Sequence, residues 1–456
     1  MFAHDLRLAL RSLRRNPILG ALMVGAIAAG IAATMMAVTL YHARAGHPIY
    51  WKDNTLFAVM LDTRDRDQMT EESFTRHPEY PPWQLTYRDA RALYQSNIPL
   101  HAVMMFKSSQ VVTPDTRGLK PFGVSTRVTT ADFFAMFAVP FLYGGGWSRA
   151  EDDAPAAAVV LSRFINQKLF GGANSVGREV TLDGHPYRVV GVLDAWMPQP
   201  KYYDPNNSSF DIPEEVYLPF GWMKAHRMQS YGNTQCVSSH AKIEGFDSLL
   251  TQDCVWLQYW VEFRAAADRD RYQAFVDNYA NEERQHGRFP RENNNRVVNV
   301  PTWLAMWDVI GDDSRLQLVL GFTFLGVCVL NTLGLMLAKF LGAAPISGLR
   351  RALGATRMDI VRQHLVEVVV VGVLGGFVGL LLTFGGLAIL KVLMFSSTLA
   401  RSDNPDRVAL VHSLVHVDVT VIVAAIVISL VTGVLAGLYP AYRIGRLAPA
   451  TFLKTQ

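Results

Sequence analysis

Four long segments without a charged residue constrain this chain more than any other feature. They are Pro17–Tyr41, Leu316–Ala338, Val368–Leu390 and Val419–Tyr442. Each reaches the roughly 20 residues that a helix needs to cross the hydrocarbon of a bilayer. Half of the 456 residues are hydrophobic and only 18% are charged, which is unusual for a soluble protein. The sequence predicts an integral membrane protein with four spans.

Basic residues gather on one side of these spans. Residues 1–16, 341–363 and 443–456 together hold eleven Lys or Arg against two acids, whereas the whole chain carries a net charge of +4. Loops rich in Lys and Arg stay in the cytoplasm, so both termini and residues 341–363 are predicted to be cytoplasmic. The long segment after the first span is then periplasmic in an inner-membrane protein. Because the membrane topology accounts for the net positive charge of the chain, that charge gives no reason to infer nucleic-acid binding.

The first span resembles a secretory signal because four arginines precede it and Ala43-Arg44-Ala45 resembles a cleavage site. Its apolar run is about twice the usual length of a signal core, so we expect a retained anchor. The predicted organisation of the chain follows from these segments. It comprises an amphipathic cytoplasmic helix (1–16), span 1 (17–43), a periplasmic domain (44–314), span 2 (315–340), a cytoplasmic coupling region (341–364), span 3 (365–392), a periplasmic loop (393–418), span 4 (419–442) and a cytoplasmic tail (443–456).

The periplasmic segment mixes strand and helix patterns. Its most regular part, Ala157–Asp194, predicts a strand, a helix, a glycine turn and two strands joined at Asp183-Gly184. Val216–Pro219 and Trp256–Arg264 are typical of strands, Ala265–Gln285 is typical of a helix, and Met228–Asp253 is expected to be a loop or an insertion. The predicted fold class is an α-helical membrane protein with four transmembrane helices and a large α+β periplasmic domain of two subdomains.

No catalytic pattern is present in the sequence. There is no Gly-x4-Gly-Lys-Ser/Thr loop for ATP phosphates, and no His-Glu-x-x-His, Cys-x-x-Cys or Gly-x-Ser-x-Gly pattern. His412 and His416 are four residues apart with Asp418 nearby, but a third ligand and its supporting shell are not evident. We expect these histidines to be interfacial, and we predict no catalytic residue, no metal and no cofactor.

Small and polar residues within the spans are candidate helix contacts. Glycines four residues apart permit close packing of membrane helices, and a polar side chain in hydrocarbon favours a hydrogen bond to a neighbouring helix. Glu367 and Lys391 bracket the third span, and we expect both to reach the membrane interface. The predicted packing residues are Asn331, Gly375, Gly379, Gly433 and Gly437.

Cys236 and Cys254 both fall in the segment assigned to the periplasm, an oxidising compartment. They form either a disulfide or two free thiols, because spacing alone does not establish geometry. Cys328 lies inside the second span and is expected to be a small apolar residue.

The cytoplasmic stretch Gly348–Glu367 is predicted to be a short basic helix, a break at Gly354 and a second helix that continues into the third span. Thr356 and Asp359 have the spacing of a capping box, which satisfies free backbone donors at a helix start. Two interpretations follow from the residues. The stretch is an ordinary basic loop, or it is a docking element for a cytoplasmic partner.

The chain resembles the MacB-like permeases of the type VII ABC transporter group, which also includes the lipoprotein-release and FtsX subunits. The resemblance covers nearly the whole chain. It rests on Val160-Leu161-Ser162, Leu169-Phe170-Gly171, Val176-Gly177 and Val189-Val190-Gly191-Val192, on Asn331, on Arg350-Arg351-Ala352-Leu353-Gly354-Ala355, and on Gly437-Leu438-Tyr439-Pro440-Ala441 with Leu447-Ala448-Pro449.

The resemblance implies a dimeric permease with porter-like and sabre-like periplasmic subdomains. It also implies a separate cytoplasmic ATPase, and a membrane-fusion protein and outer-membrane channel as further partners. Efflux of a drug or peptide is the implied function, with lipoprotein release or FtsX-like control of a cell-wall hydrolase as alternatives. The implied ATPase-docking residues are Arg350, Arg351, Ala352, Leu353, Gly354, Ala355 and Arg357.

One departure from the family pattern concerns the partner subunit. Where the family has a charged run before Arg350, this chain has Ala343-Ala344-Pro345-Ile346-Ser347-Gly348. We therefore expect the chain to be one half of a heterodimer whose second permease keeps the charged run, with a homodimer as the alternative.

Overall fold

The four apolar segments form four long helices, because a backbone surrounded by lipid must satisfy its own hydrogen bonds. They are α2 (Pro17–Arg44), α11 (Asp312–Gly342), α13 (Arg357–Leu399) and α15 (Val419–Gly445). Each contains a stretch long and apolar enough to cross a membrane. The predicted class, a helical membrane protein with four spans, is confirmed.

The computed structural model describes residues 2–65, 79–115, 118–153, 156–238, 241–399, 404–415 and 419–445. The chain divides into two units. The helical unit comprises Met1–Ala45, Ile310–Asp403 and Val411–Gln456, and the sheet unit comprises Gly46–Val309 with Asn404–Leu410. The sheet unit therefore includes a short segment that follows the third long helix in sequence.

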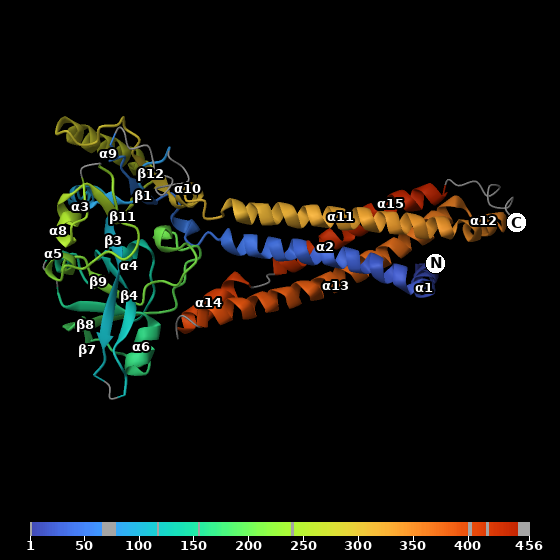
Figure 1. Cartoon of the computed structure of the whole chain (residues 1–456), viewed down its shortest axis with the longest axis horizontal. Coiled ribbons are helices and arrows are strands. Elements are labelled where there is room, and N and C mark those ends of the chain that lie inside the picture. The colour runs from blue at the N-terminus through green and yellow to red at the C-terminus, as the bar shows by residue number, and fades with distance from the viewer. Residues whose placement is uncertain are drawn as a thin grey trace. The chain divides into compact units, whose positions relative to one another are not determined.

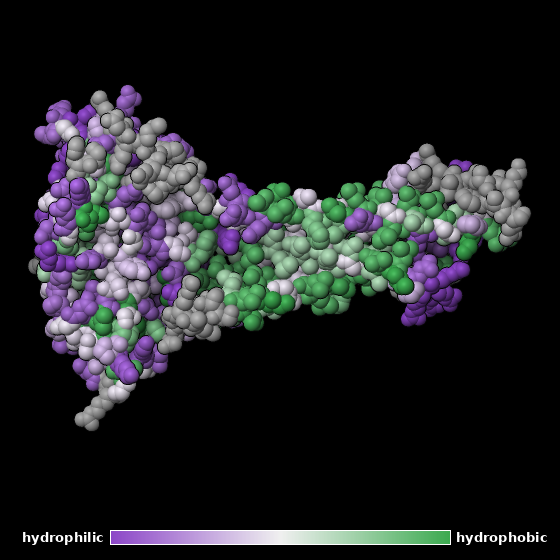
Figure 2. All heavy atoms as spheres, in the orientation of Figure 1, coloured by the Kyte–Doolittle hydropathy of each residue, from purple (hydrophilic) through white to green (hydrophobic). Residues whose placement is uncertain are grey.

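In the helical unit, α2 packs against both α11 and α13, and α15 packs against α13 (Figure 1). Met23, Ile27, Ile31 and Met35 of α2 recur at helical spacing and are buried in one cluster. Figure 2 shows hydrophobic side chains along the outer surface of these helices as well. A bundle that is apolar inside and outside suits a lipid environment. Two shorter helices, α1 (Phe2–Arg15) and α12 (Ala344–Ala352), belong to the same unit.

Twelve strands of the described chain form the sheet of the sheet unit, and most follow the order β12-β1-β11-β3-β4-β9-β6-β8-β5. The strands are β1 (Leu56–Met60), β2 (Leu85–Thr86), β3 (His101–Thr113), β4 (Phe122–Thr129), β5 (Phe141–Gly144), β6 (Ala158–Leu161), β7 (Glu179–Leu182), β8 (His185–Leu193), β9 (Val216–Pro219), β10 (Gln235–Cys236), β11 (Cys254–Glu262) and β12 (Arg296–Asn299).

The sheet is buried on both faces. Phe57 and Val59 of β1 enter one hydrophobic cluster, whereas Ala58 and Met60 enter another. Successive side chains of a strand point to opposite faces, so a core lies on each side of the sheet. Helices that contribute to the first cluster are α3 (Tyr87–Gln95), α6 (Arg163–Phe170), α7 (Trp222–Ala225), α8 (Phe246–Thr251) and α9 (Asp268–Gln285), and α4 (Phe133–Met136) and α10 (Val300–Met306) contribute to the second. The short helices α5 (Ala150–Asp153) and α14 (Pro405–Leu414) complete the described set.

The α+β character of this unit is confirmed, and β9 has the predicted bounds. The prediction that Met228–Asp253 is loop or insertion is wrong in two parts, where β10 and α8 form. Phe246 and Leu249 are three residues apart and both enter the core, which stabilises a short helix in an otherwise polar stretch. The division into two subdomains and the predicted domain boundaries stay predictions.

Candidate coupling site

The turn between α12 and α13 is fixed by local interactions. Gly354 has φ +104°, a left-handed conformation that favours glycine. The Asp359 backbone N–H donates to Thr356 Oγ1 at 3.2 Å, and the Thr356 N–H donates to the Asp359 carboxylate at 3.1 Å. These reciprocal bonds are a capping box. They confirm the predicted break at Gly354 and the predicted helix start.

Arg350 ties the two helices of this hairpin together. Its guanidinium donates to Gln363 Oε1 at 2.7 Å, and its carbonyl accepts from the Ala355 N–H at 3.1 Å. We call residues 344–363 the coupling hairpin. Because α13 continues from it without a break, a displacement of α12 moves the start of a long helix.

The coupling hairpin exposes large apolar side chains. Leu353 is 80% exposed and Met358 is 72% exposed, and Arg357 lies at the surface between them in sequence. Apolar residues rimmed by basic ones are typical of a protein interface. The structure thus brings the predicted docking residues Arg350, Leu353, Gly354, Ala355 and Arg357 into one hairpin; Arg351 and Ala352 belong to α12, and their side chains are outside the described part.

One turn beyond Gln363, a buried charged cluster joins three helices. Glu367 of α13 is 4% exposed and accepts hydrogen bonds from Lys339 of α11 and from Ser12 Oγ of α1, the latter at 2.8 Å. His364 Nδ1 lies 3.9 Å from the same carboxylate. The prediction that Glu367 reaches the membrane interface is wrong, because neighbouring helices supply its partners inside the bundle. The sequence did contain a signal for this ion pair. Lys339 lies at the end of the second span and Glu367 at the start of the third, so both are on the same side of the membrane.

The four predicted packing glycines lie where long helices touch. Gly375 and Gly379 of α13 face α2, and Gly433 and Gly437 of α15 face α13. A Cβ atom at Gly375 would come within 2.7 Å of Ile27 Cγ2, so a larger residue there requires the helices to separate.

The other predicted residues lie elsewhere. Asn331 is on an exposed face of α11. Its predicted hydrogen bond across a helix interface stays a prediction, and the partner helix would belong to a second subunit. In the structure Cys236 and Cys254 form a disulfide between registered residues of β10 and β11.

The sheet unit contains a buried charge network that no sequence pattern indicated. Arg127 of β4 donates to Asp204 and, at 2.5 Å, to Glu214, and Lys201 Nζ lies 3.2 Å from the Glu214 carboxylate. All four side chains are fully or almost fully buried. Burial acts to raise the pKa of Glu214, but the charges of Arg127 and Lys201 outweigh it and hold that pKa well below its ordinary value. These ion pairs could not be predicted from the sequence, because Lys201–Asn207 has the polar composition of a loop.

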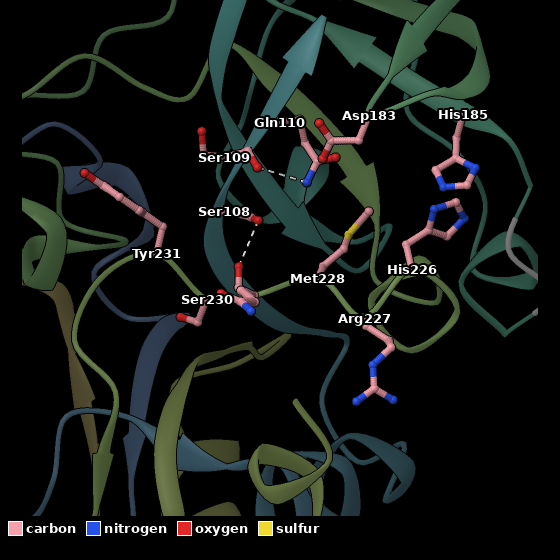
Figure 3. Close-up of a pocket in the computed structure, with 11 residues that line it drawn as sticks. Ser108, Ser109, Gln110, Asp183, His185, His226, Arg227, Met228, Ser230 and Tyr231 are labelled. Carbon is pink, nitrogen blue, oxygen red and sulfur yellow. Dashed lines mark hydrogen bonds between the residues drawn. The ribbon is translucent and has the colours of Figure 1, made fainter. Parts of the chain in front are cut away.

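A polar pocket of about 390 Å³ lies beside β3 in the same unit (Figure 3). The ring centroids of His185 and His226 are 3.8 Å apart there. Burial lowers the pKa of His226, and the charge of His185 lowers it further. The Asp183 carboxylate accepts a hydrogen bond from the backbone N–H of Val111 at 2.8 Å. Within the described residues no three His, Cys, Asp or Glu side chains converge to hold a metal. His416 and Asp418 lie outside the described residues.

Four spans, a large sheet unit between the first two, and an exposed hairpin between the second and third are the layout of a membrane permease. Two family models match the chain: the MacB-like periplasmic core domain over residues 21–279, and the FtsX-like permease C-terminal domain over residues 318–449. The chain belongs to this MacB/FtsX-type family of ABC transporter permeases. The resemblance inferred from the sequence is confirmed.

Similar curated proteins are also ABC transporter components. The permease YknZ of Bacillus subtilis, described as uncharacterized, is 26% identical over 234 residues, which cover 51% of this chain and 50% of YknZ. The pyoverdine export ATP-binding/permease protein PvdT of Pseudomonas syringae pv. syringae is 26% identical and covers 56% of this chain and 34% of PvdT. The macrolide export ATP-binding/permease protein MacB of Bdellovibrio bacteriovorus is 24% identical and covers 57% of this chain and 35% of MacB. The chain thus spans between a third and a half of the relatives it matches.

Solved structures of similar proteins include the periplasmic region of MacB from Actinobacillus actinomycetemcomitans, which is 14% identical with a TM-score of 0.35 and covers 56% of this chain and 92% of that one. The extracellular domain of YknZ is 14% identical with a TM-score of 0.32 and covers 54% of this chain and all of that domain.

Proposed function

We propose that this chain is the permease subunit of an ABC exporter, and that a separate cytoplasmic ATPase supplies the ATP hydrolysis. The family is one of ABC permeases, and the sequence contains no phosphate-binding Gly-x4-Gly-Lys-Ser/Thr loop. In this proposal the protein is in the inner membrane, with the coupling hairpin in the cytoplasm and the sheet unit in the periplasm. The basic residues around the hairpin support that orientation.

The coupling hairpin is the single observation that carries the proposal. It presents Leu353 and Met358 on a turn held rigid by the Thr356–Asp359 capping box. An ATPase seated there would displace α12 and α13 when it closes on ATP. The buried Glu367 cluster would carry this displacement to α1 and α11. The spans then transmit motion, and a second permease subunit, identical or related, completes the transporter.

Efflux of a drug or peptide is the favoured form of transport. PvdT is named for pyoverdine export and MacB for macrolide export, and both names favour outward movement. A membrane-fusion protein and an outer-membrane channel would then carry the substrate onward from the sheet unit.

Co-purification with the ATPase tests this function directly. We expect Leu353→Asp and Arg350→Glu each to lower the amount of ATPase bound to the permease about tenfold, a change that corresponds to about 1.4 kcal/mol of binding free energy. Arg15→Glu is the matched control, since it reverses an exposed charge on α1 outside the hairpin. Unchanged ATPase binding by both hairpin variants contradicts docking at this site.

Transport assays with the purified complex then separate the roles. ATP-driven movement of a drug or peptide from the side of the sheet unit through the membrane-fusion protein and the outer-membrane channel supports efflux. Release of lipoproteins instead of soluble compounds identifies a lipoprotein-release permease. ATP-dependent activation of a cell-wall hydrolase without transport identifies a signal transmitter.

A further inference from the structure

The sheet unit contains a segment that the sequence places between the third and fourth spans. Asn404–Leu410 belongs to this unit, although α13 ends at Leu399 and α15 begins at Val419. Asn404 is 1% exposed and Leu410 is buried. We call Asn404–Leu410 the outer segment.

Two polar contacts hold the outer segment against the residues that precede β9. Asn404 Nδ2 donates to Glu215 Oε1 at 3.0 Å, and Arg407 Nη1 lies 3.2 Å from Asp211 Oδ1. Asn404 also caps α14, because its Oδ1 accepts from the Asp406 N–H at 2.9 Å. A buried amide that meets a carboxylate in this way is ordered, since each group would otherwise lose hydrogen bonds to water.

The segment that receives these contacts, residues 211–215, is itself anchored in the core. Glu215 accepts from the Ser125 N–H of β4 at 3.0 Å through its other carboxylate oxygen. Its neighbour Glu214 points the opposite way, into the buried network with Arg127 and Lys201. Residues 211–215 therefore hold the outer segment on one side and the core of the sheet on the other. This geometry distinguishes the contact from an isolated surface ion pair, which contributes little rigidity.

We infer that Asn404 and Arg407 are positioning residues that fix the outer segment to residues 211–215, just before β9, and so couple movement of the third and fourth spans to the sheet unit. This inference rests on the proposed function and deepens it. The chain enters the sheet unit from α2 and leaves it towards α11, and the outer segment adds an attachment that depends on side chains. Movement of α13 or α15 reaches the sheet through it without passing through α2 or α11.

Charge reversal with rescue tests the attachment. Hydrogen–deuterium exchange is measured on the full chain, with its ATPase, in lipid nanodiscs. We expect Arg407→Asp and Asn404→Ala each to speed exchange of the amides in residues 404–410 about tenfold, the loss expected for one buried or ionic hydrogen bond. The double variant Arg407→Asp/Asp211→Arg restores slow exchange. Arg227→Asp is the matched control, because it breaks an exposed ion pair with Asp247 in the same unit.

The positioning role has a second readout, the number of substrate molecules exported per ATP hydrolysed. We expect this ratio to fall in Arg407→Asp and to recover in the double variant, while the rate of ATP hydrolysis stays unchanged. Wild-type exchange rates in both single variants overturn the attachment. Faster exchange with an unchanged export ratio overturns the positioning role. A wild-type complex that exports nothing refutes the proposed function. In that case the hydrogen–deuterium exchange rates still test whether Asn404 and Arg407 attach the outer segment.

Discussion

The Glu367 carboxylate on α13 accepts a hydrogen bond from the Lys339 ammonium on α11, and both side chains are buried in the helical unit. Taking two charges out of water is favourable only while they remain paired, since an isolated ion in a medium of low dielectric constant is strongly destabilised. The pair therefore constrains how α11 and α13 are placed against each other.

Removing one partner of this pair destabilises the bundle more than removing both. We expect Lys339→Met or Glu367→Met alone to lower the free energy of unfolding by about 3 kcal/mol or more, because each leaves a buried unpaired charge. The double variant recovers most of that loss. Unfolding in detergent titrations measures the three variants, and equal losses in the single and double variants contradict the pairing.

The packing glycines give a prediction with a control on the same helix. A Cβ atom at Gly375 meets Ile27 Cγ2 at 2.7 Å, whereas a Cβ atom at Gly385 meets nothing within 4 Å. Gly375→Leu is expected to destabilise the bundle by about 1–3 kcal/mol through overpacking. Gly385→Leu is expected to be neutral within about 0.5 kcal/mol. Thermal unfolding of the two variants in one detergent tests the difference.

The disulfide gives a redox prediction. Cys236 and Cys254 are separated by 18 residues. In the chain-entropy account, a crosslink closing a loop of about 15 residues stabilises a fold by about 3 kcal/mol. Reduction, or the double change Cys236→Ser/Cys254→Ser, should therefore lower the melting temperature of the sheet unit in the full chain. Cys328→Ala is the control, and equal melting temperatures with and without reductant reject the bond.

The buried network predicts acid sensitivity of the sheet unit. The folded-state pKa of Glu214 is held well below its ordinary value of 4.5 because Arg127 and Lys201 outweigh the effect of burial. Its contribution to stability is thus fully present above about pH 4.5 and is lost as the pH falls below that value. Tryptophan fluorescence of the full chain during acid titration checks this loss.

Glu214→Gln is expected to be less stable at neutral pH by about 3–5 kcal/mol, because the charge of Arg127 is left partly uncompensated. The variant should also lose the part of the acid transition that depends on ionised Glu214. A wild-type-like titration curve in Glu214→Gln assigns the acid sensitivity to other carboxylates.

The sequence predicted those features that local chemistry determines. A run of some 20 residues without charge is nearly sufficient evidence for a span. The cap at Thr356 and the break at Gly354 depend on residues within one helical turn, so spacing alone located them. The coupling hairpin was therefore visible before its geometry was known.

Long-range partners were not predictable in the same way. The place of Lys339 at the end of the second span was a signal for its pairing with Glu367, but nothing in the residues around Glu367 shows that α1 lies beside it and supplies Ser12. The contact of Asn404 with Glu215 joins positions 189 residues apart. Single-sequence patterns carry no information about such pairs, because they depend on which elements become neighbours in the fold.

The strand order of the sheet unit has a consequence for synthesis of the protein. β1, the first strand of this unit, pairs on one side with β11 and on the other with β12, whose residues end at Asn299. Until the ribosome has made those later strands, both edges of β1 lack their native partners. Unpaired strand edges are templates for association with other chains. During synthesis of this permease, the segment that contains β1 must therefore be shielded by a chaperone, or remain unfolded, until β12 has been synthesised.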